Sequence, residues 1–482
     1  MLDTRRHIRP FFDYEFTFSV RSGIVKFLGS LMIALGVAYI PEYTALSDAG
    51  VSSLFILVFA AALWVSEAIP AFSVALLIIA LEIVILGFPG FDFTHGGKAW
   101  EQYLKPWSSP LVFLFLAGFI MAAAASKTKL DLWMAKKVLF LVGDRPGRVL
   151  VGMVSITFIM SMFMSNTATT AMMMAVLIPI IGSMREDNAF QKALLLGVTV
   201  AANIGGLGTI IGTPPNAIAV GILGDQAPSF LGWMMIAVPP AVLMATVMTF
   251  LLMRLYPSNE ARLDLSQLKG VAHYDDSTRE FTPVPTIPSW KKSVVVLIFA
   301  ATILLWLTGP LHHIPTTVVS LLPIVAFTIF GIIDTDDIRE LRWDVIILII
   351  GGLSLGLAVA KSGLAAWFAG LFPLEGVPLM GVVMLFSFII VIVSNFMSNT
   401  AATNIILPLI VAFAAHLGSG DAKLAVIAVA MSASFAMCLP VSTPPNAIVY
   451  ASGRIEARDF LLIGGVTAVL GPLVVLGWMS LM

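Results

Sequence analysis

Two short polar motifs lie inside long apolar stretches of the sequence. Ser165-Asn166-Thr167 recurs 233 residues later as Ser398-Asn399-Thr400, and Ser161 recurs as Ser394 at the same spacing. Hydroxyl and amide oxygens are ligands that transporters offer to sodium, and the O–H and N–H groups of the same side chains can hold a carboxylate. One such triplet would indicate a packing feature or a kink. Two copies at one spacing indicate a binding site.

A second motif, TPPNA, is also present twice. It occupies residues 213–217 and 443–447, which are 230 residues apart, and Gly118 recurs as Gly352 at an offset of 234. Ordered matches at nearly constant spacing indicate an internal duplication. The two polar motifs therefore belong to two related halves of one chain.

The composition indicates the medium that surrounds these motifs. Of 482 residues, 59% are hydrophobic and 11% are charged, and the formal net charge is −1. These values indicate a polytopic membrane protein surrounded by lipid, and they give no support to nucleic-acid binding. The single cysteine, Cys438, excludes an internal disulfide and a cysteine-based metal cluster.

Apolar windows of about 20 residues predict eleven membrane-spanning helices. We place the spans at 24–40, 52–68, 71–88, 110–126, 193–224, 231–253, 293–309, 316–333, 344–360, 424–452 and 459–481. Two further apolar segments, 149–183 and 379–413, are interrupted by the polar triplets. A non-helical break at membrane depth survives only inside protein or beside a cavity, so each interrupted segment is predicted to be a re-entrant hairpin.

The charges test the resulting topology. After the first span each half holds five full spans, an odd number, so the second half must be inverted relative to the first. With the N-terminus in the cytoplasm and the C-terminus outside, 23 of the 27 Lys and Arg residues fall in cytoplasmic loops or at the start of the first span. This positive-inside bias supports an inverted repeat, and such repeats place substrate sites at broken helices near the membrane midplane.

The motifs also predict how the breaks are built. Ser165 and Ser398 are good N-caps for the helices that follow them, while Thr213 and Thr443 can cap helices that begin at prolines. Four half-helix N-termini, each with about half a positive charge, would then converge near the centre and suit an anion. No charged residue lies in 149–184, 193–224, 379–413 or 424–452, so a multivalent anion there must bring cations with it. Symport with sodium is the simplest solution.

Pseudo-symmetry assigns two sodium sites to side chains and backbone carbonyls at these breaks. The first site comprises Ser161, Ser165, Asn166 and the backbone of Gly212. The second comprises Ser394, Asn399 and the backbones of Met397 and Ser442.

The motifs resemble those of a known family. Together with LWVSEAIP at 63–70 and AANIGGLGTIIGTPPNAIAVG at 201–221, the paired triplets and TPPNA motifs are similar to those of the divalent anion:sodium symporters, the INDY-type di- and tricarboxylate carriers. The resemblance implies an elevator-type homodimer in the plasma (inner) membrane that carries C4-dicarboxylates such as succinate, malate and fumarate, or citrate, with several sodium ions. The substrate contacts that it implies are Ser165, Asn166, Thr167, Ser398, Asn399, Thr400, Thr443 and Pro444.

The resemblance also divides the chain into segments. Scaffold parts are expected at 1–148 and 293–378, transport-domain parts at 149–253 and 379–482, and a cytoplasmic linker at 254–292. Ser442 stands where the family commonly has Ala, and Ser394 where it commonly has Thr. A sodium-independent dicarboxylate exchanger and a citrate-preferring symporter remain alternatives within the family. An intramembrane protease finds no catalytic group in the spans, and a channel is disfavoured by the occluding hairpins.

Overall fold

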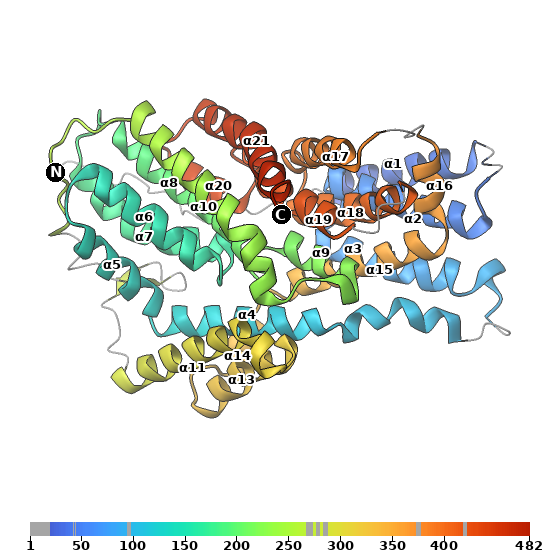
Figure 1. Cartoon of the computed structure of the whole chain (residues 1–482), viewed down its shortest axis with the longest axis horizontal. Coiled ribbons are helices and arrows are strands. Elements are labelled where there is room, and N and C mark those ends of the chain that lie inside the picture. Colours follow the sequence, from blue (N-terminus) through green and yellow to red (C-terminus); the bar gives the residue numbers. More distant parts are fainter. Residues whose placement is uncertain are drawn as a thin grey trace.

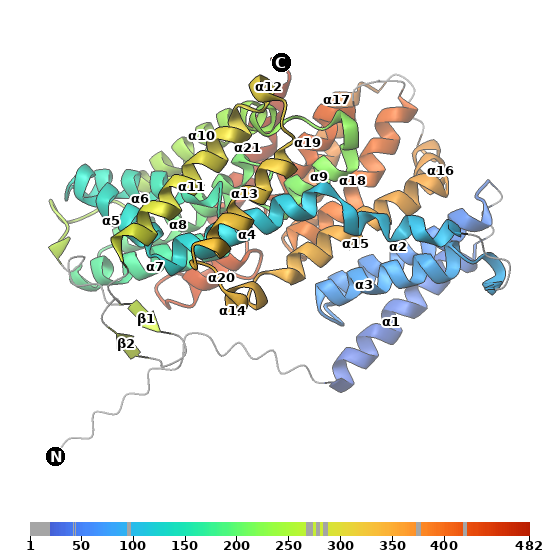
Figure 2. The same cartoon turned by 90° about the horizontal axis from the view of Figure 1, so that it is seen from below.

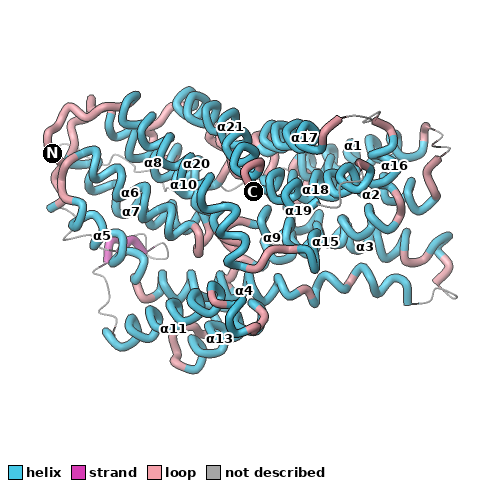
Figure 3. Tube along the Cα trace, in the orientation of Figure 1, coloured by secondary structure: helices cyan, strands magenta, loops and turns pink. Residues whose placement is uncertain are grey.

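The computed structural model shows an elongated helical protein (Figures 1 and 3). It describes residues 20–41, 43, 45–93, 98–266, 273–275, 280–282, 288–372, 377–417 and 422–482. Strands β1 (His273–Asp275) and β2 (Glu280–Thr282) pair antiparallel and form the single sheet in these residues. The predicted all-α class is confirmed, with one small β-hairpin inside the segment 254–292.

Helices occupy all eleven predicted spans. They are α1 (Val20–Tyr39), α2 (Asp48–Ser66), α3 (Ala71–Leu81) with a π-helical turn Glu82–Leu86, α4 (Pro110–Lys127), α8 (Phe190–Gly205) with α9 (Pro214–Leu223), α10 (Phe230–Leu255), α11 (Ser289–Leu307), α13 (Thr316–Ile329), α15 (Trp343–Lys361), α19 (Ala422–Ala433) with α20 (Pro444–Tyr450), and α21 (Ala457–Met479). In the described residues ten helices are long and apolar enough to cross a membrane, and two of these are hairpin arms. The chain is a multi-pass membrane protein.

Both interrupted segments are helical hairpins. The first pairs α6 (Pro146–Ser161) with α7 (Asn166–Ser183), and the second pairs α17 (Leu379–Ser394) with α18 (Asn399–His416). The first arms are both 16 residues long and the second arms are both 18. The order from α4 to α10 is thus repeated from α15 to α21, as the duplicated motifs predict.

Several short helices connect these elements. The segment between Lys127 and Arg148 contains α5 (Leu130–Val142), and α16 (Leu364–Gly370) follows α15 at the equivalent place in the second half. The remaining pieces are α12 (Gly309–His312), α14 (Thr335–Arg339) and 3-10 turns at Pro89–Phe91, Lys98–Tyr103, Lys105–Ser108, Gly206–Gly208 and Gly224–Gln226.

The first halves of both broken helices, α8 and α19, are deeply buried. In α8, 94% of the spanning window is buried, against 22% in α1 and in α11. Helices α1 to α3 and α16 lie at one end of the long axis, and α5 to α8 lie at the other (Figures 1 and 2). The peripheral helices therefore present apolar surface to lipid, while α8 and α19 form the interior against which the hairpins pack.

Small residues let α15 pack closely on both of its neighbours. A Cβ added at Gly351 would lie 2.4 Å from the Cβ of Ala75 on α3, and one added at Gly352 would lie 1.8 Å from Oδ1 of Asn404 on α18. Helix α15 is thus held between α3 and the second hairpin.

Candidate functional site

The first hairpin tip packs against the break between α8 and α9. Ser165 caps α7, since its Oγ accepts a hydrogen bond from the backbone N–H of Ala168 at 3.2 Å. Ser161 Oγ lies 2.7 Å from Asn166 Oδ1 and 2.7 Å from the carbonyl oxygen of Ala202, on α8. A serine hydroxyl carries one proton, so Ser161 donates to one of these oxygens at a time.

Two glycines bring the break close to this tip. A Cβ at Gly206 would lie 2.6 Å from Asn166 Oδ1, and a Cβ at Gly212 would lie 2.4 Å from the carbonyl oxygen of Gly206. Asn216 of the TPPNA motif stabilises the non-helical break, because its Nδ2 donates to the carbonyls of Gly206 at 3.0 Å and Thr209 at 2.7 Å. The predicted first sodium ligands, Ser161, Ser165, Asn166 and Gly212, are thus brought together.

The second tip has the same outline but leaves two oxygens open. Ser398 caps α18 by accepting from the N–H of Ala401 at 3.2 Å. Ser394 Oγ and Asn399 Oδ1 are both buried and have no hydrogen-bond partner among the described residues. Buried polar atoms are normally paired, so two unpaired oxygens on predicted ligands of one hairpin tip are available to a cation.

The second break, between α19 and α20, contacts its tip through Asn395. Asn395 Oδ1 accepts from the N–H of Cys438 at 2.8 Å and from Ser442 Oγ at 3.0 Å. Asn446 Nδ2 donates to the carbonyls of Met437 at 3.0 Å and Leu439 at 2.8 Å, as Asn216 does in the first break. No described residue donates to the backbone carbonyls predicted as sodium ligands, those of Gly212, Met397 and Ser442.

The two halves of the chain contact each other at the site. Asn203 on α8 donates from Nδ2 to Thr443 Oγ1 at 3.1 Å, across to the second TPPNA motif. Helix α20 packs against α7 and α8, and α9 packs against α18 and α19. The half-helix that begins at Pro444 therefore packs against the helix that begins at Asn166, so predicted substrate residues of the two halves lie on helices in contact.

The predicted residues differ in exposure. Ser398 and Pro444 are exposed, while Thr400 and Thr443 are buried. The remaining predicted substrate residues are partly exposed: Ser165, Asn166, Thr167 and Asn399. Polar groups that stay open at the ends of buried helices can exchange a solute with an aqueous cavity.

The electrostatics of the site come from helix ends and neutral side chains. Thr443 caps α20 through the N–H of Asn446 at 3.3 Å, and α20 and α9 both begin at a proline. Thr213 occupies the N-cap position of α9 as predicted, but its side chain makes no capping hydrogen bond. Three of the four half-helices are thus capped by their own side chains, and each N-terminus still carries partial positive charge.

Sequence reasoning missed the residues that join tips to breaks. Asn203, Asn395 and Thr209 were not predicted, although Thr209 donates from Oγ1 to the carbonyl of Met162 in the first tip. An asparagine in an apolar helix is the signal that could have found the first two. Thr209 carries no such signal, since a lone threonine is common in membrane helices.

Together the two hairpins, the two broken helices and the repeated order of elements define the class of protein as a secondary membrane transporter. A family model described as the sodium:sulfate symporter transmembrane region matches residues 21–482. The chain belongs to this family of sodium-coupled transporters and is not an enzyme. The resemblance seen in the motifs is thereby confirmed.

Named relatives agree with this assignment. The chain is 31% identical over 451 residues to the sodium-dependent dicarboxylate transporter SdcS of Staphylococcus saprophyticus, covering 87% of this chain and 83% of the relative. It is 32% identical to SdcS of Staphylococcus aureus, covering 86% and 82%.

Two solved transporters share the fold. MtrF of Neisseria gonorrhoeae, described as illuminating a class of antimetabolite efflux pumps, has a TM-score of 0.56 at 11% identity and covers 86% of this chain and 95% of its own. YdaH of Alcanivorax borkumensis, described as having an unusual topology, has a TM-score of 0.55 at 14% identity and covers 85% and 98%.

Proposed function

We propose that this protein is a sodium-coupled symporter of C4-dicarboxylates such as succinate, malate and fumarate. It acts in the plasma (inner) membrane as a homodimer, with its N-terminus in the cytoplasm and its C-terminus outside. The SdcS relatives are named as sodium-dependent dicarboxylate transporters, which supports both the ion and the substrate class.

One observation carries the proposal most directly. Ser394 Oγ and Asn399 Oδ1 are buried without a partner in the part of the chain that the structure describes, and no charged residue lies between 379 and 413. Leaving such oxygens unpaired costs about 1–3 kcal/mol each, and a sodium ion would satisfy both. The cation would also supply the positive charge that a dianion needs and that no side chain of the site provides.

The geometry also suggests how ion and substrate are coupled. At the first tip the Ser161 proton can move from Asn166 Oδ1 to the Ala202 carbonyl, which frees both side-chain oxygens for sodium. A cation on Oδ1 then fixes the orientation of the Asn166 amide, and its Nδ2 donates to no described residue and is free to bind a carboxylate. Asn399 would act in the same way at the second tip. Sodium binding therefore orders the donors that the dianion requires.

The transported unit would contain both hairpins and both broken helices. In this proposal the segments 149–253 and 379–482 move as one elevator domain against the scaffold parts 1–148 and 293–378. Residues 165–167 and 398–400 contact the substrate, with Thr443 and Pro444 beside a carboxylate. The hydrogen bond between Asn203 and Thr443 supports a single moving body, because it joins the two halves within the site.

The first prediction tests the assignment of the tips. Asn166→Ala and Asn399→Ala are each expected to lower sodium-driven uptake of labelled succinate into proteoliposomes by at least about 100-fold, since each removes a sodium ligand and a carboxylate donor together. Asn259→Ala, the same change at an exposed position between α10 and α11, is the control and should transport normally. Near-normal uptake by both tip variants would refute the assignment.

The same vesicles separate the alternatives. Uptake should need a sodium gradient, and it should be competed more weakly by citrate than by malate. Efflux of preloaded succinate that needs external dicarboxylate but no sodium would identify an exchanger. Stronger competition by citrate would identify a tricarboxylate-preferring carrier.

A further inference from the structure

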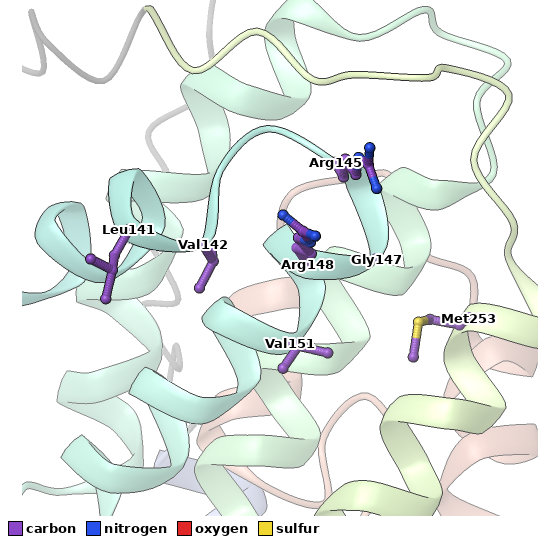
Figure 4. Close-up of a pocket in the computed structure, with 7 residues that line it drawn as sticks. All are labelled: Leu141, Val142, Arg145, Gly147, Arg148, Val151 and Met253. Atoms are coloured by element: carbon purple, nitrogen blue, oxygen red, sulfur yellow. The ribbon is translucent and has the colours of Figure 1, made fainter.

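An open pocket lies where α5 ends, α6 begins and α10 passes beside them, outside the transport site. Arg145, the N-cap residue of α6, and Arg148, in its first turn, form the cationic end of the pocket, and Figure 4 shows Val151 below them on the helix of Arg148. Its apolar wall consists of Leu141, Val142, Val151 and Met253. The pocket thus has a cationic end and an apolar end.

The two arginines are uncompensated. Neither guanidinium makes a hydrogen bond or an ion pair with any residue that the structure describes. The adjacent acid, Asp144, is already engaged by Arg262 Nη1 at 3.3 Å. Arg145 is the N-cap residue of α6 and Arg148 lies in its first turn, and both line the same pocket. Two like charges at one pocket repel each other unless an anion lies between them.

The surroundings place this pocket at a membrane surface. The side chain of Leu141 is 85% exposed and that of Val151 is 46% exposed. On α5, Trp133 and Phe140 are also exposed, which is the pattern of a helix that lies in the interface with its apolar face in lipid. Lys137 covers the Trp133 ring at 4.7 Å, as expected of an interfacial anchor.

We propose that this pocket binds the headgroup of an anionic phospholipid of the cytoplasmic leaflet. Arginine pairs with phosphate through two parallel hydrogen bonds, and the acyl chains would lie along the apolar wall. Anionic lipids concentrate in the cytoplasmic leaflet, the side on which our topology places the loop between α5 and α6. The proposal of a lipid site depends on that topology but not on which substrate the protein transports.

A second groove on α21 provides an internal contrast. Arg458 stands at its cytoplasmic end above the exposed side chains of Leu461, Leu462 and Val469. Here, however, Glu456 pairs with Arg458 through Oε2–Nε at 2.8 Å and Oε1–Nη2 at 3.1 Å. The two grooves have similar walls, but only the pocket on α6 leaves its arginines available to a phosphate.

Native mass spectrometry of the full chain in a non-ionic detergent tests the proposal, with titration of phosphatidylglycerol and phosphatidylcholine. The wild-type protein should retain phosphatidylglycerol in preference. The double variant Arg145→Gln/Arg148→Gln should bind it at least about tenfold more weakly, because each basic residue near an anionic lipid contributes roughly a fivefold factor. Each single variant should be intermediate, and Arg458→Gln should bind like the wild type.

Four results would overturn the proposal. The first is equal retention of the two lipids by the wild type, and the second is unchanged phosphatidylglycerol binding by the double variant. The third is a loss of phosphatidylglycerol binding in Arg458→Gln equal to that in the double variant. The fourth is displacement of the lipid by soluble glycerol phosphate at the lipid's own concentration, which would identify a phosphate site. Light scattering would give a fifth contradicting result. If the double variant changed its oligomeric state while its lipid binding stayed the same, a second copy of the chain, and not a lipid, would cover the pocket. These experiments measure no transport, so a failed succinate uptake assay would not change the result of the lipid-binding test.

Discussion

The two hairpin tips have the same sequence pattern and the same helix lengths, yet they satisfy their polar atoms differently. In the first tip Ser161 Oγ lies within hydrogen-bond distance of Asn166 Oδ1, so the two predicted ligands pair with each other. In the second, Ser394 Oγ and Asn399 Oδ1 are buried and unpaired. The first site can close on itself without an ion, whereas the second has no partner for its oxygens within the described protein.

The connection between tip and break also differs. Thr209 in the first break binds the backbone of the first tip, and Ser442 in the second break binds Asn395 of the second tip. These residues are not equivalent in the two copies, since position 212 corresponds to Ser442 and is glycine in the first half. The duplication thus preserves the contact between tip and break while changing the residues that make it.

The largest expected effect comes from Gly352 on α15, which faces the second hairpin, and its counterpart Gly118 on α4 provides the comparison. A Cβ at Gly352 would lie 1.8 Å from Asn404 Oδ1, whereas a Cβ at Gly118 would lie 3.3 Å from the nearest Ile211 side-chain atom. Overpacking of a tight contact costs about 1–3 kcal/mol, so Gly352→Ala should lower the melting temperature in detergent by several degrees and reduce uptake.

Gly118→Ala is the matched control, because Ile211 can move by a few tenths of an ångström and alanine favours the helix by about 1 kcal/mol. Its melting temperature should stay close to that of the wild type. Equal melting temperatures for Gly352→Ala and Gly118→Ala would contradict the close packing of α15 on α18.

The next effect separates the two tips. Ser394→Ala removes a hydroxyl that has no protein partner, so the sodium concentration for half-maximal uptake should rise about tenfold while stability without sodium is unchanged or improved. Ser161→Ala also removes a hydrogen bond to Ala202 or Asn166, and should therefore lower both sodium affinity and sodium-free stability, the latter by about 1 kcal/mol.

Uptake at varied sodium and melting temperatures in sodium-free buffer distinguish these outcomes. If Ser394→Ala lost as much sodium-free stability as Ser161→Ala, the second tip would be paired in the protein and the contrast between the tips would be lost.

Much of this architecture could be predicted from the sequence. Apolar length located all eleven spans, and the duplicated triplets located both hairpins, because the bilayer requires continuous helices and permits breaks only beside a site. The caps at Ser165, Ser398 and Thr443 followed from the preference of hydroxyl side chains for helix N-termini.

The features that were missed depend on tertiary packing. Helix α5 is short and carries charges, so it gives no spanning signal, although its exposed Trp133 and Phe140 show that it has an apolar face. Thr213 has the sequence of a cap, but the first break is held by Asn216 instead. The pairing of Asn203 with Thr443 joins residues 240 positions apart, and no local pattern predicts such a contact.

The smallest expected effect concerns the lysines that end α4 and α15. Lys127 Nζ lies 2.8 Å from Asp334 Oδ2 and 2.5 Å from Asp337 Oδ2, whereas Lys361 Nζ lies 2.6 Å from the neutral Gln102 Oε1. The hydrogen bond from Lys127 lowers the pKa of Asp334 from 3.8 to about 2. The first contact therefore contains a titrating group with a shifted pKa, and the second contains none in the acidic range.

Folding lowers the pKa of this carboxyl group, so the group stabilises the fold at every pH above its pKa in the unfolded chain, near pH 4. This contribution is lost as the pH falls toward 2, the pKa in the folded protein. Asp334→Asn keeps the cap of α14, because asparagine caps helices well, and it removes only the charge. Its melting temperature should thus lie slightly below that of the wild type at pH 7, and the gap should narrow between pH 4 and pH 2. Both side chains are partly exposed, so the gap should also shrink in high salt.

Gln102→Glu makes the second contact resemble the first. A carboxylate opposite Lys361 should give this variant a small gain in melting temperature at pH 7 that disappears below about pH 4, since the new group must be ionised to pair with the lysine. Gln102→Ala, which removes the partner without adding charge, should show no such pH dependence. If Gln102→Glu behaved like Gln102→Ala at every pH, the two lysine contacts would differ in more than the charge of their partners. The repeat would then relate the ends of α4 and α15 in position but not in energetics.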